Sequence, residues 1–281
     1  RKLGAQVMGL GAFTKVVGDA GVTVAKKASL PVTTGNSYSA SGALWAAHEG
    51  LRQLGLAEID ERGAIRGKAM VIGATGAIGS VCSRLLALAS DEIYLVSPET
   101  AKLLTLKHEI ERDHPRATVH LAATPDEHLS DMDVIVTATS GAGKRVLDIM
   151  DVKPGCVITD VARPLDLSAE DVAKRPDVLV VESGEIELPG DVRMKNIGLP
   201  PNVVYACLAE TVVLALEGRY ETFTVGRNIE WEKVKEIYRL GLKHGMKLAA
   251  ISGVNGIFTP EQIAEIRERA VAARAAAGVA G

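Results

Sequence analysis

The chain has 281 residues, of which 47% are hydrophobic and 24% are charged, and its formal net charge is -3. This composition is typical of a folded protein with an apolar core and excludes an intrinsically disordered chain. The small negative charge, with no Lys/Arg tract longer than a pair, gives no electrostatic basis for binding nucleic acid.

Membrane, metal and disulfide signals are missing from the sequence. No apolar run reaches the roughly 18 to 20 residues that cross a bilayer, and the first residues lead directly into a strand-like segment instead of a signal peptide. Cys82, Cys156 and Cys207 are too far apart for a disulfide framework or a zinc site, and the six histidines show no metal-ligand spacing. We therefore expect a cytoplasmic protein without a bound metal.

The amino-terminal residues predict a partial α/β segment over residues 1–56. Residues 6–10 have the pattern of a strand, 12–28 that of a helix, and 30–33 that of a second extended piece. Apolar residues at helical spacing predict another helix over 41–54. We expect this segment to lie on the substrate side of the protein.

Residues 57–199 carry the pattern of a doubly wound parallel sheet. Short apolar runs alternate there with helical patterns, as in successive βαβ units. The runs occupy residues 68–72, 93–96, 117–121, 134–137, 156–159 and 178–181. We therefore predict an α/β protein whose central domain is a Rossmann-like, dinucleotide-binding fold.

A glycine-rich turn, Gly73-x-x-Gly76-x-x-Gly79, joins the first of these strands to a helix. Glycines permit the tight turn and the close approach of a pyrophosphate, and the helix N-terminus supplies N–H groups and a positive dipole end. A turn without a ligand is the alternative, which the strand and helix around it disfavour. The predicted cofactor site therefore includes Gly73, Thr75, Gly76, Ala77, Ile78 and Gly79.

The second strand bears on the choice between NAD and NADP. It ends at Ser97, where a carboxylate would hold the ribose 2′-hydroxyl of NAD. A hydroxyl there and the nearby cation of Lys102 suit a 2′-phosphate, so we predict NADP(H), with Glu99 as the alternative ribose ligand. Thr137, Thr139 and Asp160 follow the fourth and fifth strands and extend the predicted cofactor site, although ordinary loop polarity explains them equally well.

Residues 200–281 predict a helical carboxyl-terminal part that packs back on the substrate side. A helix over 203–217 follows Pro200 and Pro201, a second covers 230–240, and a third opens at the capping box that begins at Thr259. Cys207 falls in the second turn of the first helix. Its pattern, like those of Cys82 and Cys156, favours a buried core position, because unpaired cysteine is among the most buried residue types.

Several motifs occur together in a recognisable order. They are Gly9-Leu10-Gly11-Ala12-Phe13-Thr14, Thr33-Thr34-Gly35-Asn36-Ser37-Tyr38-Ser39-Ala40, Gly73-Ala74-Thr75-Gly76-Ala77-Ile78-Gly79-Ser80, Ala206-Cys207-Leu208-Ala209-Glu210, Gly226-Arg227-Asn228 and Lys243-His244-Gly245. This combination, over about residues 4–246, resembles the long-chain acyl-[acyl-carrier-protein] reductases of cyanobacteria. The resemblance implies NADPH-dependent reduction of a long-chain fatty acyl thioester to a fatty aldehyde, with Cys207 as the nucleophile that takes the acyl group.

The resemblance also suggests further site residues and a partner. Thr34, Asn36 and Tyr38 would face the substrate, and we expect His244 to assist Cys207 as a cation or base. The implied partner is an acidic acyl carrier protein, with a coenzyme A thioester as the other carrier. Docking of the carrier would use a basic patch, for which the candidates are Lys15, Lys26 and Lys27. The sequence gives no indication of oligomeric state.

Several features of the sequence depart from the family pattern, among them the loop after the fourth strand. The family carries a further amino-terminal region, which we expect this chain to lack. The loop after the fifth strand resembles Asp-Gly-Gly-Tyr-Pro in the family but is Asp160-Val161-Ala162-Arg163-Pro164 here.

Two other functions are compatible with the sequence. One is a shikimate dehydrogenase-like enzyme that transfers a hydride directly to a small polar substrate, for which Lys15 and Asp19 offer an oddly spaced Lys/Asp pair. The other is a non-catalytic NADP(H)-binding protein in which Cys207 is inert.

Overall fold

The computed structural model describes residues 2–11, 18–140 and 145–278. The chain divides into two compact units. Unit 1 contains residues 1–42 and 184–249, and unit 2 contains residues 43–183 and 250–281. These divisions differ from the predicted domains 1–56, 57–199 and 200–281. The predicted amino-terminal segment is divided between the units after residue 42, and the predicted carboxyl-terminal part is divided after residue 249.

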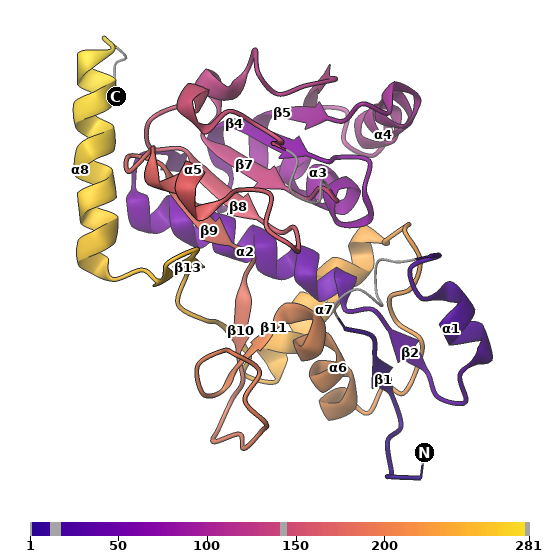
Figure 1. Ribbon diagram of the computed structural model, residues 1–281. Helices are drawn as coiled ribbons and strands as arrows, with labels where there is room; N and C mark the ends of the chain where they lie inside the picture. Colours follow the sequence, from indigo (N-terminus) through magenta and orange to yellow (C-terminus); the bar gives the residue numbers. More distant parts are fainter. Residues whose placement is uncertain (1, 12–17, 141–144, 279–281) are drawn as a thin grey trace. The chain divides into compact units, whose positions relative to one another are not determined.

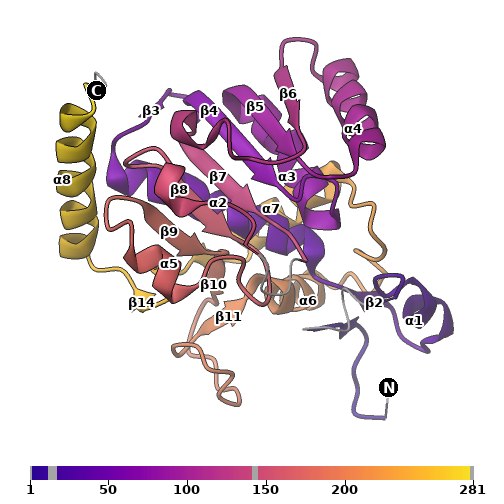
Figure 2. The same cartoon turned by 45° about the horizontal axis from the view of Figure 1, so that its top comes forward.

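Unit 2 is built on a parallel sheet with the strand order β6-β5-β4-β7-β8-β9, and β3 pairs antiparallel with β4 (Figure 2). The strands are β3 (Glu58–Ile59), β4 (Ile65–Ile72), β5 (Ser90–Val96), β6 (Thr118–Ala122), β7 (Val134–Thr137), β8 (Val157–Asp160) and β9 (Leu179–Glu182). Taken in chain order, the six parallel strands have the spatial order 3-2-1-4-5-6, which is that of the Rossmann fold. This order confirms the predicted fold class.

Helices and short turns of 3-10 helix connect the strands of unit 2. They are α3 (Ala77–Ala89), α4 (Thr100–Asp113), η2 (Leu129–Asp131), η3 (Ile149–Asp151) and α5 (Ala169–Ala173). Because side chains alternate along a strand, Ile158 and Val180 enter one buried cluster, which also contains Cys156. Val157 points to the opposite face, where Gly50 of α2 (Asn36–Leu54) approaches so closely that a Cβ there would lie 3.0 Å from its side chain.

The last thirty-two residues of the chain belong to unit 2. Strands β13 (Ser252–Gly253) and β14 (Gly256–Ile257) form an antiparallel pair, and α8 (Pro260–Ala276) follows them (Figure 1). The capping box at Thr259 and Gln262 is formed as predicted. The buried Arg274 of α8 donates hydrogen bonds to the backbone carbonyl oxygens of Pro154 and Leu56, at 2.9 and 3.2 Å, which anchors the helix to the sheet unit.

Unit 1 contains two small sheets and several helices. Strand β1 (Met8–Gly9) pairs in parallel with β2 (Val32–Thr33), and β10 (Glu185–Glu187) lies between β11 (Val203–Tyr205) and β12 (Lys247–Leu248). The helices are α1 (Val22–Lys27), the first residues of α2, α6 (Ala206–Glu217) and α7 (Trp231–Lys243).

Four predicted helices have different bounds in the structure, and three of them begin at other residues than predicted. The helix predicted over 12–28 is limited, among the described residues, to α1, because a turn with positive φ at Ala20 and Gly21 precedes it; residues 12–17 lie outside the described part. Helix α2 begins at Asn36 instead of residue 41. The helix predicted over 203–217 begins only at Ala206, because residues 203–205 pair with β10 as strand β11.

Helix α7 also runs further than predicted. It continues past residue 240, where it was predicted to end, and stops at Lys243; Gly245, two residues later, takes a positive φ of 80°. Within the described residues, no helix has both the length and the hydropathy that a membrane span requires.

Candidate functional site

The glycine turn of unit 2 requires glycine for steric reasons. Gly73 has a φ of +83°, and a Cβ at this position would lie 2.8 Å from the carbonyl oxygen of Ala138. A Cβ at Gly79 would lie 2.1 Å from the carbonyl oxygen of Gly73. Gly76 is the N-cap of α3, so the N–H groups of Ala77 and Ile78 in the first helical turn have no partner within the helix. The geometry of the turn is compatible with the pyrophosphate of a nicotinamide dinucleotide.

Polar side chains lie beside this turn at the end of β5. The hydroxyl oxygen of Thr75 is 2.8 Å from that of Ser97, and Thr75 donates a hydrogen bond of 2.8 Å to Glu99. Lys102 pairs with the same carboxylate. The structure thus brings together the residues predicted to hold a 2′-phosphate, and it also brings in Glu99, the alternative ligand for an unphosphorylated ribose.

Asp160 and Thr137 lie opposite each other where β8 and β7 end. Asp160 is buried, and its carboxylate accepts hydrogen bonds from the backbone N–H groups of Ala162 and Leu167, at 3.1 and 2.9 Å. Burial raises the pKa of this carboxyl to about 6. Thr139 donates to Asp166 through both its backbone N–H and its hydroxyl. These bonds fix the two loops at the carboxyl edge of the sheet, where such folds bind their ligands.

Cys207 is the most accessible of the three thiols. Cys82 and Cys156 are fully buried in unit 2, and burial raises the pKa of both, to about 12 for Cys82. Cys207 is half-buried in unit 1 and is the second residue of α6. It therefore lies in the first helical turn, whereas the sequence had predicted the second turn. The start of a helix favours a negative charge there.

Gly35 packs directly against Cys207. Its φ is +74°, and a Cβ at this position would lie 2.3 Å from the carbonyl oxygen and 2.5 Å from the Cβ of Cys207. Only glycine fits this contact. Because α2 begins at the next residue, Asn36, the contact places the N-terminal end of a second helix beside the thiol.

Glu210 holds this arrangement in place. It is fully buried one turn after Cys207, and its carboxylate accepts hydrogen bonds from the hydroxyl of Thr33 and from the backbone N–H of Tyr38, the latter at 2.9 Å. Burial raises its pKa. Thr224 adds a second tie, because its carbonyl oxygen accepts from the backbone N–H of Thr34 at 2.8 Å. The segment 33–38 is thereby fixed against α6.

The role of Glu210 was not expected from the sequence, although the residue belongs to one of the motifs. A signal was present: Glu210 is the one charged residue on the buried face of α6, whose other buried members are Ala206, Ala209, Val213 and Leu214. A carboxylate on such a face needs hydrogen-bond donors from elsewhere in the fold.

The predicted substrate residues Thr34, Asn36 and Tyr38 surround Gly35, but all three are buried. In the described part of the chain, the side-chain oxygens of Asn36 and Tyr38 have no hydrogen-bond partner. The Tyr38 hydroxyl packs against Gly241, where an added Cβ would lie 2.1 Å from the hydroxyl oxygen. Burial raises the pKa of this hydroxyl. These side chains therefore support the wall beside Cys207 and do not form an open surface.

His244 does not meet Cys207, contrary to our expectation. Its Nε2 lies 2.6 Å from the carboxylate of Glu217, which also pairs with Lys243. Lys243 and then His244 hold the pKa of Glu217 below its usual range. Glu217 ends α6 ten residues after Cys207, about 15 Å along the helix axis. The pairing was misjudged because α7 ends beside the far end of α6.

The remaining candidates do not gather into a site. Lys15 lies outside the described residues, whereas Lys26 and Lys27 form the last turn of α1. The carboxylate of Asp19 accepts hydrogen bonds from the backbone N–H and the hydroxyl of Thr23, at 2.9 and 2.6 Å. Among the residues that the structure describes, no group of three His, Cys, Asp or Glu side chains is placed to hold a metal ion.

Comparison with known proteins finds similar sequences that include two enzymes of different classes, and no protein-family model matches the chain. The aminotransferase PigE of a Serratia strain is 33% identical over 250 residues, which cover 86% of this chain. The chain spans 28% of the length of that protein. The long-chain acyl-[acyl-carrier-protein] reductase of Synechococcus elongatus is 27% identical over 267 residues, which cover 90% of this chain and 74% of the reductase.

Solved structures with a similar chain course include two oxidoreductases. Quinate dehydrogenase from Corynebacterium glutamicum, in complex with NAD, has a TM-score of 0.43 and 14% identity, over 72% of this chain and 61% of the dehydrogenase. The Δ1-pyrroline-2-carboxylate reductase of Thermococcus litoralis has a TM-score of 0.39 and 16% identity, over 79% of this chain and 68% of the reductase. The assignment of the fold rests on the strand order and the glycine turn.

Proposed function

We propose that the protein reduces a long-chain fatty acyl thioester, bound to an acyl carrier protein or to coenzyme A, to a fatty aldehyde with NADPH. The observation that carries this proposal is the position of Cys207, half-buried in the first turn of α6 and enclosed by the Gly35 contact, in a chain that also has a dinucleotide-binding turn. The similarity to the Synechococcus reductase supports the choice of substrate.

The first chemical step is acylation of Cys207. Its thiolate attacks the carbonyl carbon of the substrate, a new C–S bond to the enzyme forms, and the bond to the carrier sulfur breaks. The carrier leaves as a thiol after taking up the proton that Cys207 lost. The N-terminal ends of α6 and α2 stabilise the negative charge that builds up on the thiolate and on the carbonyl oxygen.

The second step is reduction of the acyl group held on Cys207. NADPH, when bound at the Gly73–Gly79 turn, supplies the hydride. Hydride addition would leave the oxygen of the acyl group on Cys207 as the alkoxide of a thiohemiacetal, and breakage of the C–S bond would then release the aldehyde and return the thiolate without a net change in protons. The ties from Glu210 to Thr33 and Tyr38 keep the wall beside the thiol fixed through both steps.

Cofactor preference, partner and compartment complete the proposal. The hydroxyls of Thr75 and Ser97 together with Lys102 would hold the 2′-phosphate of NADPH. Lys26 and Lys27 would contribute to the surface that an acidic carrier protein meets. Three unpaired thiols fit a reducing compartment such as the cytoplasm.

Among the residues that the structure describes, nothing favours direct hydride transfer to a small polar substrate. The carboxylate of Asp19, one half of the Lys/Asp pair that such an enzyme would need, is engaged with Thr23. The experiment below distinguishes an enzyme from a protein that binds NADP(H) without catalysing a reaction.

The decisive experiment mixes the protein with hexadecanoyl coenzyme A. With NADPH present, we expect hexadecanal, detected by gas chromatography. Without NADPH, mass spectrometry should find the hexadecanoyl mass on the peptide that contains Cys207. Aldehyde without the adduct would favour direct hydride attack, and the absence of both products would support a non-catalytic protein.

A further inference from the structure

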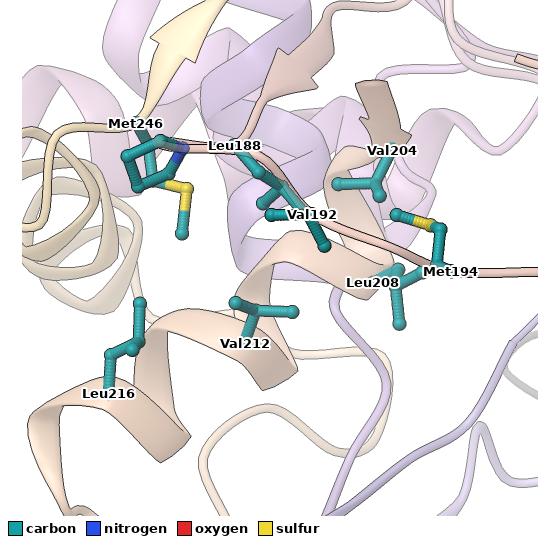
Figure 3. Close-up of a pocket in the computed structure, with 9 residues that line it drawn as sticks. Leu188, Val192, Met194, Val204, Leu208, Val212, Leu216 and Met246 are labelled. Carbon is teal, nitrogen blue, oxygen red and sulfur yellow. The ribbon is translucent and has the colours of Figure 1, made fainter. Parts of the chain in front are cut away.

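An apolar cavity of about 370 Å³ lies in unit 1, along helix α6 (Figure 3). One wall is the helix itself, and the other is the segment from Leu188 to Met194, with Met246 closing one end. All of the lining residues are apolar. The volume is in the range of a small-molecule pocket, and such pockets usually carry a few polar groups that orient the ligand. This cavity has none among its lining side chains, so its ligand must itself be apolar.

One lining residue of the cavity, Leu208, is the neighbour in sequence of the proposed nucleophile. Leu208, Val212 and Leu216 are four residues apart, so they stack on one face of α6, as Figure 3 shows. They extend along about 12 Å of helix. Leu208 follows Cys207 directly and lies in the same first turn. Successive side chains of a helix point in different directions, so an apolar chain attached at the thiol would reach the cavity by passing over the neighbouring side chain of Leu208, and it would then run towards Leu216.

The walls of the cavity expose more apolar surface than a sealed core would. Leu208, Leu216 and Met194 are 39%, 53% and 40% exposed. Burial of this surface by a ligand is favourable, and each methylene removed from water strengthens binding about fourfold. A protein partner fits the feature less well, because a typical protein interface covers about 800 Å² on each side and has a polar rim.

We propose that this cavity binds the hydrocarbon chain of the acyl group and that the residues along α6, Leu216 above all, determine the preferred chain length. This inference rests on the proposed function, since the acyl group is the substrate of that reaction. It assigns a ligand site that is separate from the residues that surround the thiol.

The test measures binding without catalysis. The fluorescence of cis-parinaric acid, a long-chain fatty acid, is titrated with the protein in the absence of NADPH. Leu216→Asp places a charge in the cavity and should weaken binding about tenfold or more. The matched control is Leu242→Asp on α7, because Leu242 is 46% exposed, lies in the same unit and does not line the cavity. It should change the affinity less than twofold.

A second variant tests the dependence on length. Leu216→Trp fills the far end of the cavity and, at an exposed position, leaves the core of unit 1 intact. In competition with parinaric acid, hexadecanoic acid should bind about tenfold more weakly to this variant, whereas octanoic acid should bind within twofold of its affinity for the native protein.

The outcomes separate this site from the proposed function. Equal weakening by Leu216→Asp and Leu242→Asp, or no saturable binding to the native protein, would overturn the cavity as the chain site. Aldehyde formation that Leu216→Asp leaves unchanged would overturn it while the proposed function stands. Selective loss of fatty acid binding in Leu216→Asp, in a protein that forms no aldehyde, would support the cavity and contradict the proposed function.

Discussion

The cofactor turn of unit 2 is one stretch of seven residues, Gly73–Gly79, whereas the surroundings of Cys207 in unit 1 come from three separate parts of the chain. In the turn, Gly73 is needed because of Ala138, just after the adjoining strand β7, and Gly79 is needed because of Gly73 itself. Beside Cys207, Gly35 is needed because of a residue 172 positions later. The cofactor site can therefore be recognised locally, and the thiol site exists only once the fold has formed.

Of the changes that test this comparison, substitution of Cys207 should have the largest effect on activity. Cys207→Ser keeps the shape of the side chain but offers a far poorer nucleophile, so we expect thioester reduction to fall about 1,000-fold or more. NADPH binding, which uses unit 2, should be unchanged. Turnover by gas chromatography and cofactor titration measure the two properties.

Cys156→Ser is the matched control for Cys207→Ser. It places a hydroxyl in the buried cluster of unit 2, so it should lower the free energy of unfolding by about 1 to 3 kcal/mol. Turnover per folded molecule should be retained. If Cys207→Ser kept full turnover, the covalent mechanism would be wrong.

The buried carboxyl of Asp160 should make the stability of unit 2 depend on pH. Its pKa rises from 3.8 to about 6 on folding, because burial disfavours the charged form. Between these values the folded protein binds more protons than the unfolded chain, so stability falls as the pH rises through this window, by up to about 3 kcal/mol. Asp160→Asn should remove this fall, as measured by urea unfolding from pH 4 to pH 7.

The exposed Asp126 offers a control for that measurement. Asp126→Asn should leave the pH profile of the native protein unchanged. Parallel profiles for the native protein and Asp160→Asn would contradict the raised pKa.

Gly35→Ala tests the long-range contact in unit 1. The new Cβ would meet the backbone of Cys207 in a left-handed conformation that alanine disfavours, so we expect the rate of acylation to fall about 30-fold. Gly198 also has a positive φ, of +83°, but a Cβ there has open space, so Gly198→Ala should change the rate less than twofold. Burst kinetics with an acyl thioester measure this step. Equal effects of the two variants would show that the Cys207 contact is unimportant.

Lys102→Ala should give the smallest change. Removal of the cation beside Ser97 should weaken NADPH binding about tenfold and leave NADH binding within twofold, because only NADPH carries the 2′-phosphate. Dissociation constants for both cofactors check this. Tighter binding of NADH than of NADPH by the native protein would instead identify Glu99 as the ribose ligand.

Much of unit 2 and little of unit 1 was predictable from the sequence. The strands of unit 2 show as short apolar runs, because parallel strands are covered on both faces. The capping box at Thr259 is equally local. The start of α6 was misplaced because residues 203–205 have helical neighbours in sequence but pair with β10 in space. The candidate roles of Cys207 and of the glycine turn were visible, whereas Glu210 as an anchor was not.

The local sequence pattern by itself determined the Rossmann-like unit and the position of its glycine turn, whereas Cys207 was singled out only by the resemblance of the ordered motifs to a known family. The reason is that backbone hydrogen bonding, apolar alternation and glycine sterics act between near neighbours. Only the tertiary structure decided that Gly35 and Glu210 fix the wall beside Cys207, that His244 pairs with Glu217, and that an apolar cavity follows α6. Those features depend on contacts between residues far apart along the chain, which no local pattern specifies.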